Sequence, residues 1–164
     1  MFRIGVITAS DKGARGERED LSGQAIAKMT ASLGEVQKYV IVPDEQAALS
    51  AAMIDMADNL RLDLVLTTGG TGLGPRDVTP EATLAVIDRE VPGLAEAMRM
   101  GSLAKTPRAM LSRAVAGIRG RTLIVNLPGS PRGVEECLEI ILPALDHGLA
   151  IMRGEAGECA RPPA

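Results

Sequence analysis

Three apolar segments, each separated from the next by a helical pattern, constrain the fold of this chain more than any other feature. Residues 2–9, 36–42 and 63–68 are rich in Ile, Val and Leu, as buried strands are. Apolar residues recur at helical spacing over residues 21–33 and from about 43 to 60. Such alternation is typical of a parallel sheet that helices cover on both faces. The sequence therefore predicts an α/β fold, a three-layer sandwich with a mostly parallel central sheet.

The second half of the chain continues the pattern with one reversal. Residues 114–118 and 122–127 flank a basic Arg-Gly-Arg turn and predict a hairpin. No linker or repeat divides the chain, so we expect one domain over residues 1–153 and a flexible tail over 154–164. The other predicted elements are a loop over 12–20 and helices over 80–89, 93–104 and 134–149.

Composition excludes several classes of function. The 164 residues carry a formal net charge of −3 with no long basic run, and only 1% are aromatic, which argues against a nucleic-acid surface. No apolar stretch reaches the roughly 18 residues that span a bilayer, so we expect a cytoplasmic protein without membrane partners. A single histidine, His147, argues against a zinc site or a histidine-based nucleophile.

A glycine-rich turn follows the third apolar segment, with Gly69, Gly70, Gly72 and Gly74 within six residues. Glycines let a backbone approach a ligand closely and direct amide groups toward it. The following Thr79-Pro80-Glu81 is a helix-opening sequence, with Thr79 as the expected cap. Amide groups and a helix N-terminus both favour anions, so the turn predicts a site for phosphate.

Pro75 excludes two familiar phosphate loops. A P-loop beginning at Gly69 requires Lys where Pro75 stands, and a dinucleotide fingerprint beginning at Gly70 requires a small residue there. The turn is therefore neither of these, and by itself it indicates only an anion or a close backbone approach.

Polar residues follow each predicted parallel strand at its carboxyl end, where ligands bind in open α/β sheets. This convergence predicts a site built from Ser10-Asp11, Pro43-Asp44, Thr68-Gly69-Gly70 and Asn126-Leu127-Pro128-Gly129. Asp44 directly precedes a helix, so an N-cap and a functional role remain open for it. Asp20 is a candidate cap for the helix at residue 21. Asp77 lies two residues before Thr79, where a capping role explains it less well, so a functional role is favoured for it.

Carboxylates at such an edge can hold Mg²⁺, glycine amides can hold phosphates, and a substrate can bring its own nucleophile. Phosphoryl or nucleotidyl transfer requires little more from the protein. Cys137 lies at helical spacing with apolar residues, and Cys159 has no partner motif, so neither is assigned a chemical role.

The sequence Thr67-Thr68-Gly69-Gly70-Thr71-Gly72, followed by Pro75-Arg76-Asp77-Val78-Thr79-Pro80-Glu81-Ala82-Thr83, resembles the signature of the molybdopterin-binding MoaB/Mog family. The resemblance extends in order over nearly the whole chain. The further blocks are Ser10-Asp11, Asp20-Leu21-Ser22-Gly23, Val42-Pro43-Asp44-Glu45, Ser112-Arg113 and Asn126-Leu127-Pro128-Gly129-Ser130-Pro131.

The resemblance implies a homotrimer and molybdopterin adenylyltransferase activity in molybdenum cofactor biosynthesis. The terminal phosphate of molybdopterin would attack the α-phosphate of Mg-ATP and release pyrophosphate. Asp44 and Asp77 would assist catalysis through Mg²⁺ or the reacting phosphates. The residues expected to bind the substrates are Ser10, Asp11, Asp20, Ser22, Gly23, Thr68, Gly69, Gly70, Thr71, Gly72, Thr79, Pro80, Glu81, Asn126, Pro128, Gly129 and Ser130.

A second hypothesis is a non-catalytic molybdopterin-binding protein of the same pathway, which would bind the pterin but not nucleotide. Other cofactor-assembly proteins are expected partners in either case. A third, weaker hypothesis is a small phosphate-binding domain with a different ligand.

Overall fold

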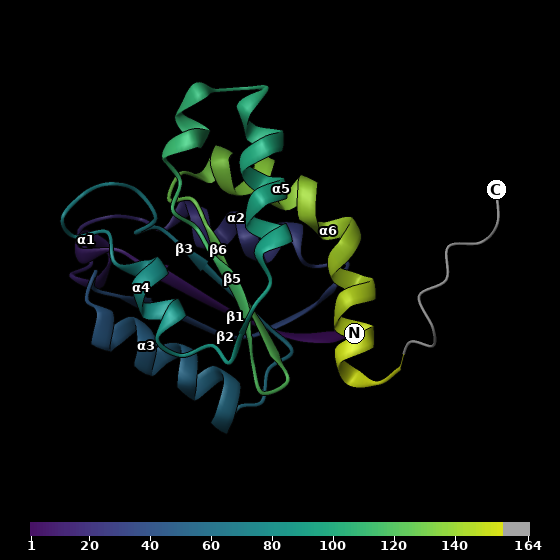
Figure 1. Ribbon diagram of the computed structural model, residues 1–164. Coiled ribbons are helices and arrows are strands. Elements are labelled where there is room, and N and C mark those ends of the chain that lie inside the picture. The colour runs from purple at the N-terminus through teal and green to yellow at the C-terminus, as the bar shows by residue number, and fades with distance from the viewer. Residues whose placement is uncertain (156–164) are drawn as a thin grey trace.

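A computed structural model describes residues 1–155 of the chain, and a six-stranded sheet forms its centre (Figure 1). The strand order is β2-β1-β3-β6-β5-β4. The first four of these run parallel, and β5 and β4 are antiparallel to their neighbours. The strands are β1 (Phe2–Ala9), β2 (Gly34–Val42), β3 (Leu64–Thr68), β4 (Arg89–Glu90), β5 (Ala116–Arg119) and β6 (Thr122–Leu127).

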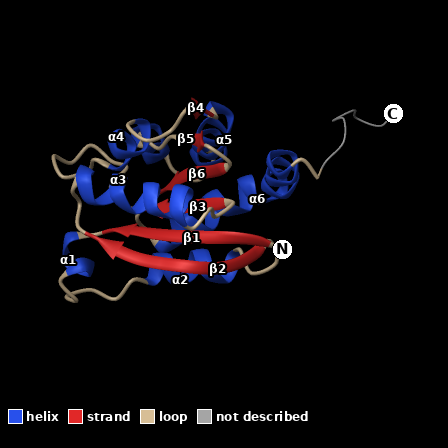
Figure 2. Cartoon of the chain, turned by 90° about the horizontal axis from the view of Figure 1, so that it is seen from below, coloured by secondary structure: helices blue, strands red, loops and turns tan. Residues whose placement is uncertain are grey.

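Helices cover both faces of the sheet, which confirms the predicted three-layer α/β fold (Figure 2). One face packs against α2 (Leu21–Met29), α5 (Pro92–Leu103) and α6 (Pro131–Arg153). The other face packs against α3 (Gln46–Ile54), the π-helical turn η1 (Asp55–Asn59) and α4 (Thr79–Leu84). The short helices α1 (Asp11–Ala14) and η2 (Pro107–Leu111), the latter a 3₁₀ helix, lie in connections.

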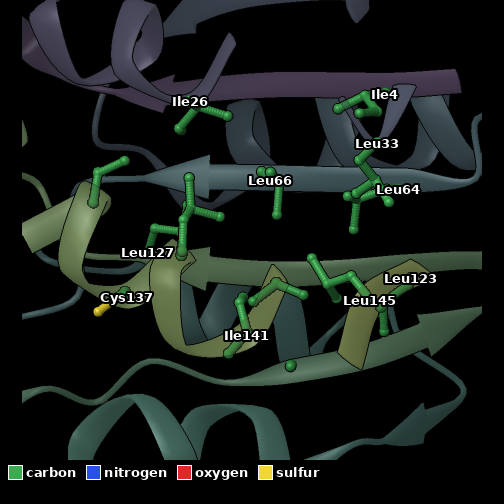
Figure 3. Packing of buried hydrophobic residues seen from close by; sticks show 14 of the residues in the cluster. Ile4, Ile26, Leu33, Leu64, Leu66, Leu123, Leu127, Cys137, Ile141 and Leu145 are labelled. Atoms are coloured by element: carbon green, nitrogen blue, oxygen red, sulfur yellow. The ribbon is translucent and has the colours of Figure 1, made fainter. Parts of the chain in front are cut away.

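Strand β3 shows why the strands had to be apolar throughout. Leu64 and Leu66 point into one core and Val65 into the other, because successive side chains alternate across a sheet. Figure 3 shows the first core, where Leu64 and Leu66 meet Ile26, Ile141 and Leu145 from the helices. Both cores are almost entirely aliphatic, as the scarcity of aromatic residues predicts.

The predictions of a loop over residues 12–20 and of a helix that reaches residue 60 were each wrong in part. The predicted loop over 12–20 contains α1, whose first turn Ser10 caps by accepting a hydrogen bond from the N–H of Gly13 at 2.9 Å. The predicted helix reaching residue 60 ends as an α-helix at Ile54 and continues as the π-helical turn η1. Leu60, placed on its apolar stripe, is 40% exposed.

The predicted helix over 80–89 was also too long. Helix α4 ends at Leu84, and Arg89–Glu90 pair with β5 instead. The N–H of Asp88 donates to Ile118 at 2.7 Å and that of Val91 to Ala116 at 2.8 Å. Pairing with a distant strand therefore overrode the local helical pattern.

The hairpin formed by β5 and β6 is confirmed, and the final helix is longer than its predicted span of 134–149. Gly154 ends α6 in the left-handed conformation, at φ 75°. Most of the predicted tail, including Cys159, lies outside the described residues. None of the helices within residues 1–155 is both long and apolar enough to cross a membrane.

Candidate active site at the carboxyl edge of the sheet

Three parallel strands end side by side at the edge of the sheet that α1 adjoins (Figure 2). Thr8 lies opposite Thr68, and Thr68 lies opposite Leu127. The hydroxyl of Thr68 donates to the carbonyl of Pro128 at 2.7 Å, which fixes the third strand end against the second. The sequence-predicted convergence of strand ends is therefore present in the fold.

Gly69 and Gly70 turn the chain away from β3 with positive φ angles of 89° and 66°. A Cβ on Gly69 would lie 2.5 Å from the carbonyl oxygen of Ala9, and one on Gly70 would lie 2.3 Å from Oγ1 of Thr79. Both positions therefore exclude side chains for two reasons, backbone conformation and lack of space.

Thr79 holds this turn in place from the first residue of α4. Its hydroxyl donates to the carbonyl of Gly69 at 2.9 Å, and its N–H donates to that of Gly70 at 3.1 Å. The prediction that Thr79 caps α4 was wrong, because Val78 occupies the cap position and makes no side-chain cap hydrogen bond. The hydroxyl is used across the turn rather than along the helix.

Asp44 lies beside the turn, with Oδ1 3.4 Å from the position of a Cβ on Gly70. Its Oδ2 accepts a hydrogen bond from the N–H of Asp11 at 2.9 Å. The N-cap interpretation of Asp44 was wrong, since Glu45 occupies that position in α3. Burial raises the pKa of Asp44, and the charges of Asp11 and Asp77 raise it further.

Arg76 pairs with Asp11 across the edge, an interaction that no sequence pattern predicts. Its Nε and Nη2 donate to the two carboxylate oxygens of Asp11 at 3.1 and 2.9 Å. These bonds hold the pKa of Asp11 below its ordinary value. Asp11 is therefore neutralised by a neighbour, whereas Asp44 is crowded by other acids.

Asp77 bonds to Gly74 in the same loop through both its side chain and its backbone. Its Oδ2 accepts from the N–H of Gly74 at 2.8 Å, and its N–H donates back to the carbonyl of Gly74 at 3.0 Å. A Cβ on Gly72 would lie 2.9 Å from the same oxygen, so the carboxylate is held directly against the glycine-rich chain.

Arg113 fastens this loop from outside it, and sequence reasoning assigned it no role. Its Nε donates to the carbonyl of Gly72 and its Nη2 to that of Asp77, each at 2.7 Å, while Nη1 pairs with Glu81. The ion pair lowers the pKa of Glu81. Arg113 stands in one of the sequence blocks that carry the family resemblance, and that was the only signal available.

Asp20 accepts hydrogen bonds from Thr8, Gly23 and Tyr39, and so connects β1, α2 and β2. It caps α2, as predicted, by accepting from the N–H of Gly23 at 2.9 Å. Its other oxygen accepts hydrogen bonds from the hydroxyls of Thr8 and Tyr39. Burial and the bond to Asp20 raise the pKa of Tyr39 to about 12.

Two further predicted residues connect the strand ends to one another. The hydroxyl of Ser22 donates to the carbonyl of Gly129 at 2.7 Å. The buried amide of Asn126 donates to the hydroxyls of Thr67 at 3.0 Å and Thr83 at 2.8 Å. The polar atoms of Asn126 are thus used within the scaffold.

A cleft of about 620 Å³ opens beside the glycine turn, towards α5, η2 and α6. Basic side chains from these helices and from the connection between α5 and η2 line it, namely Arg99, Lys105, Arg108 and Arg132. Such a lining suits an anionic ligand. The predicted residues that line the cleft are Thr71, Gly72, Asn126, Pro128 and Ser130.

Asp11, Asp44 and Asp77 lie outside the lining of this cleft, whereas Glu136 belongs to it and pairs with Lys105 and Arg132. Gly72 belongs to the lining and also adjoins the carboxylate of Asp77. The geometry therefore brings a cationic cleft and an acidic cluster together across the glycine turn. The cleft thus offers positive charge to an anionic ligand, and the carboxylates beside it can interact with a cation.

Within residues 1–155, no group of three or more His, Cys, Asp or Glu side chains is placed to hold a metal ion. Asp44 and Asp77 nevertheless suit Mg²⁺, which takes one or two carboxylates and completes its shell with water and substrate phosphates. The hydrogen bonds described for the two side chains use Oδ2 of each, and the mutual charge raises the pKa of Asp44. A divalent cation relieves such repulsion.

The sequence matches known proteins over most of its length. The model of the probable molybdopterin binding domain matches residues 5–147. Over 156 residues the chain is 46% identical to the molybdopterin adenylyltransferase of Helicobacter pylori strain J99, covering 93% of this chain and 89% of that protein. The Escherichia coli K12 protein of the same name is 46% identical over 157 residues, with 93% and 79% covered.

Solved structures give the same result. The molybdopterin biosynthesis enzyme MoaB of Thermus thermophilus superposes with a TM-score of 0.89 at 57% identity, covering 94% of this chain and 98% of that one. The tungsten cofactor synthesizing protein MoaB of Pyrococcus furiosus gives 0.85 at 41% identity, with 93% and 98% covered. With both its sequence and its fold matching, the chain belongs to the MoaB/Mog family of molybdopterin-binding domains.

Proposed function

We propose that this protein is a molybdopterin adenylyltransferase, which transfers AMP from Mg-ATP to the terminal phosphate of molybdopterin. The observation that carries the proposal is the placement of Asp44 and Asp77 at the glycine turn, beside a cationic cleft. Relatives that share 46% of their residues with this chain over most of its length bear that name.

The reaction needs no nucleophile from the protein. An oxygen of the terminal phosphate of molybdopterin forms a bond to the α-phosphorus of ATP. The bond from that phosphorus to the oxygen bridging to the β-phosphate breaks, and pyrophosphate carries away the electron pair. Catalysis then rests on holding the two phosphates in line and stabilising the charge that they share.

Several residues supply that positioning. Thr79 and Arg113 keep the glycine turn in one conformation at the edge where phosphates would lie. The basic side chains of the cleft suit the phosphate of the pterin substrate.

Asp44 and Asp77 would hold Mg²⁺ through their carboxylate oxygens. When bound, the ion supplies positive charge that neutralises the triphosphate and the departing pyrophosphate. The acids must be ionised for this, so the raised pKa of Asp44 sets the lower limit of pH at which they can do so.

The proposal extends to the location, the oligomeric state and the partners of the enzyme. It acts in the cytoplasm as a homotrimer with a single molybdopterin-binding domain over residues 1–153. It exchanges substrate and product with other cofactor-assembly proteins, and it does not act on nucleic acid or membranes.

The test is pyrophosphate release from ATP by the purified protein. Release should require both molybdopterin and Mg²⁺, and Asp77→Asn should retain molybdopterin binding while losing about 10²- to 10³-fold in turnover. Asp88 is an exposed acid between α4 and β4, away from the glycine turn. The variant Asp88→Asn therefore serves as the matched control, and its turnover should equal that of the unmodified protein. Tight pterin binding with no ATP binding by the unmodified protein would establish the non-catalytic hypothesis instead.

A further inference from the structure

A second cavity, of about 650 Å³, lies at the amino ends of the parallel strands. Arg3 at the start of β1, Asp63 just before β3 and Thr122 at the start of β6 all line it. The candidate active site lies at the opposite, carboxyl ends of the same strands. The N-terminus and the last turn of α6 meet here (Figures 1 and 2), where Arg153 donates to the carbonyl of Met1 at 3.2 Å.

Four arginines and three acids line this cavity, in a chain whose formal net charge is −3. The acids already have partners. Nε and Nη2 of Arg153 donate to Asp63 at 3.0 and 2.7 Å, and the N–H of Arg3 donates to it at 2.7 Å. Burial alone would raise the pKa of Asp63, but these bonds outweigh burial and lower it.

The other two acids are engaged in the same way. Asp58 pairs with Arg119 at 2.6 Å, and Glu155 pairs with Arg153 at 3.5 Å. The carboxylates of the cavity are therefore neutralised by Arg3, Arg119 and Arg153.

Arg61 and Arg121 are the two arginines of the cavity lining that form no ion pair with these acids. Within the described residues, the guanidinium of Arg61 meets no acceptor, and that of Arg121 makes one bond, from Nη2 to the carbonyl of Arg153 at 3.1 Å. Each guanidinium carries five N–H groups, so most of their donors remain available.

The backbone at Arg61 is a second, independent feature. At φ 51° it is the one non-glycine residue of positive φ in residues 1–155. Glycine would adopt this conformation without steric cost, yet the chain carries a long cationic side chain there. The guanidinium of Arg3 donates to the carbonyl of Arg61 and so fixes that conformation.

We propose that this cavity is an anion-binding site that receives the phosphate group of a small molecule between Arg61 and Arg121. A guanidinium presents a planar pair of donors that matches two oxygens of a phosphate. The volume exceeds what inorganic phosphate fills, which favours an organic phosphate. The site is separate from the proposed transferase reaction and does not depend on it.

The experiment is an NMR titration of the full-length, ¹⁵N-labelled protein with inorganic phosphate and then with glucose 6-phosphate. Sodium chloride at the same ionic strength serves as the reference. Saturable shifts are expected at the amides of residues 61–63 and 121–122. Tighter binding of the sugar phosphate would identify an organic phosphate as the ligand, and equal binding would identify the phosphate group alone.

Three variants test the arginines. Arg61→Gln combined with Arg121→Gln should weaken phosphate binding at these amides at least tenfold. Arg61→Lys keeps the positive charge but loses the planar pair of guanidinium donors, so it should weaken phosphate binding less than the double variant does. Arg89→Gln, an exposed arginine on β4, should bind as the unmodified protein does.

Each contrary result is decisive. The proposal is overturned if chloride causes the same shifts, if no saturable shift occurs at these amides, or if the double variant binds unchanged. Shifts at residues 69–79 report the carboxyl edge and bear only on the proposed transferase site.

Discussion

Asp11 and Asp44 hold each other through a reciprocal pair of hydrogen bonds. Oδ2 of Asp44 accepts from the N–H of Asp11 at 2.9 Å, and the N–H of Asp44 donates to Oδ1 of Asp11 at 3.0 Å. The pair joins the segment after β1 to the segment after β2, two strand ends that the sequence separates by more than thirty residues. It also fixes Asp44 while leaving its Oδ1 beside the glycine turn.

Asp44→Asn should stabilise the metal-free protein at pH 7 while abolishing turnover. Because the folded-state pKa of Asp44 is raised, ionisation of this side chain opposes folding above its unfolded pKa of about 3.9. Asn removes that charge and can still accept the bond from Asp11. Urea unfolding with EDTA present measures the effect, and a lower midpoint than that of the unmodified protein would contradict it.

Asp77→Asn should lower the pKa of Asp44, because one of the charges that raises it is removed. A ¹³C NMR titration of the Asp44 carboxyl in metal-free protein measures the shift. Asp58→Asn, which removes an acid at the other end of the sheet, should leave the titration unchanged. An unchanged pKa in the Asp77 variant would mean that the two acids do not interact.

Arg113→Lys should reduce turnover by about tenfold or more, because lysine cannot bond Gly72, Asp77 and Glu81 together. The loop would then hold the Asp77 carboxylate less rigidly. The matched control is Arg119→Lys, which loses comparable bonds to Asp58 and Val86 away from the turn. Steady-state rates of pyrophosphate release compare them, and equal losses in both variants would refute a positioning role for Arg113.

Gly70→Ala should destabilise the protein more than Gly16→Ala does. Both glycines have positive φ, 66° and 72°, so each alanine incurs a backbone strain of about 1–2 kcal/mol. A Cβ at Gly16 meets nothing within 4 Å, whereas one at Gly70 meets Oγ1 of Thr79 at 2.3 Å. Urea unfolding of the two variants isolates the Thr79 contact, and equal free energies of unfolding would show that the turn can relax.

Asp63→Asn should cost about 1–3 kcal/mol of stability at pH 7, because it removes the charge of the carboxylate that accepts two hydrogen bonds from Arg153. The pKa of Asp63 is lowered in the folded state, so its contribution is present above the unfolded pKa of about 3.9. It is lost as pH falls through the folded value. The difference between the two proteins should therefore vanish in acid.

Asp58→Asn is the matched control for Asp63→Asn, since the Asp58 side chain is 45% exposed and its pair with Arg119 should contribute only about 0–1 kcal/mol. Unfolding midpoints of both variants across pH make the comparison. A constant difference at all pH values for Asp63→Asn would show that charge is not the source of its stability.

The sequence by itself determined the layers of this fold and the edge that carries the site. Continuous apolar strands must be buried on both faces, so β1 and β3 could only lie inside a helix-covered sheet, and their polar ends could only meet at one edge. The turn at Gly69 and Gly70 was also predictable from the sequence, because few residues other than glycine adopt the positive φ angles that it needs.

Asp20 caps α2 as its sequence predicts, but only the tertiary structure decided what most other polar side chains of the site do. Asp44 and Thr79 had the local sequence of helix caps, yet Asp44 bonds to Asp11 and Thr79 bonds across the glycine turn. Arg113 had no signal beyond its place in a block of the family resemblance, and no pattern assigned Arg61 or Arg121 to a site. Such partners are set by packing between strands far apart in the chain, whereas helix and strand patterns depend on near neighbours.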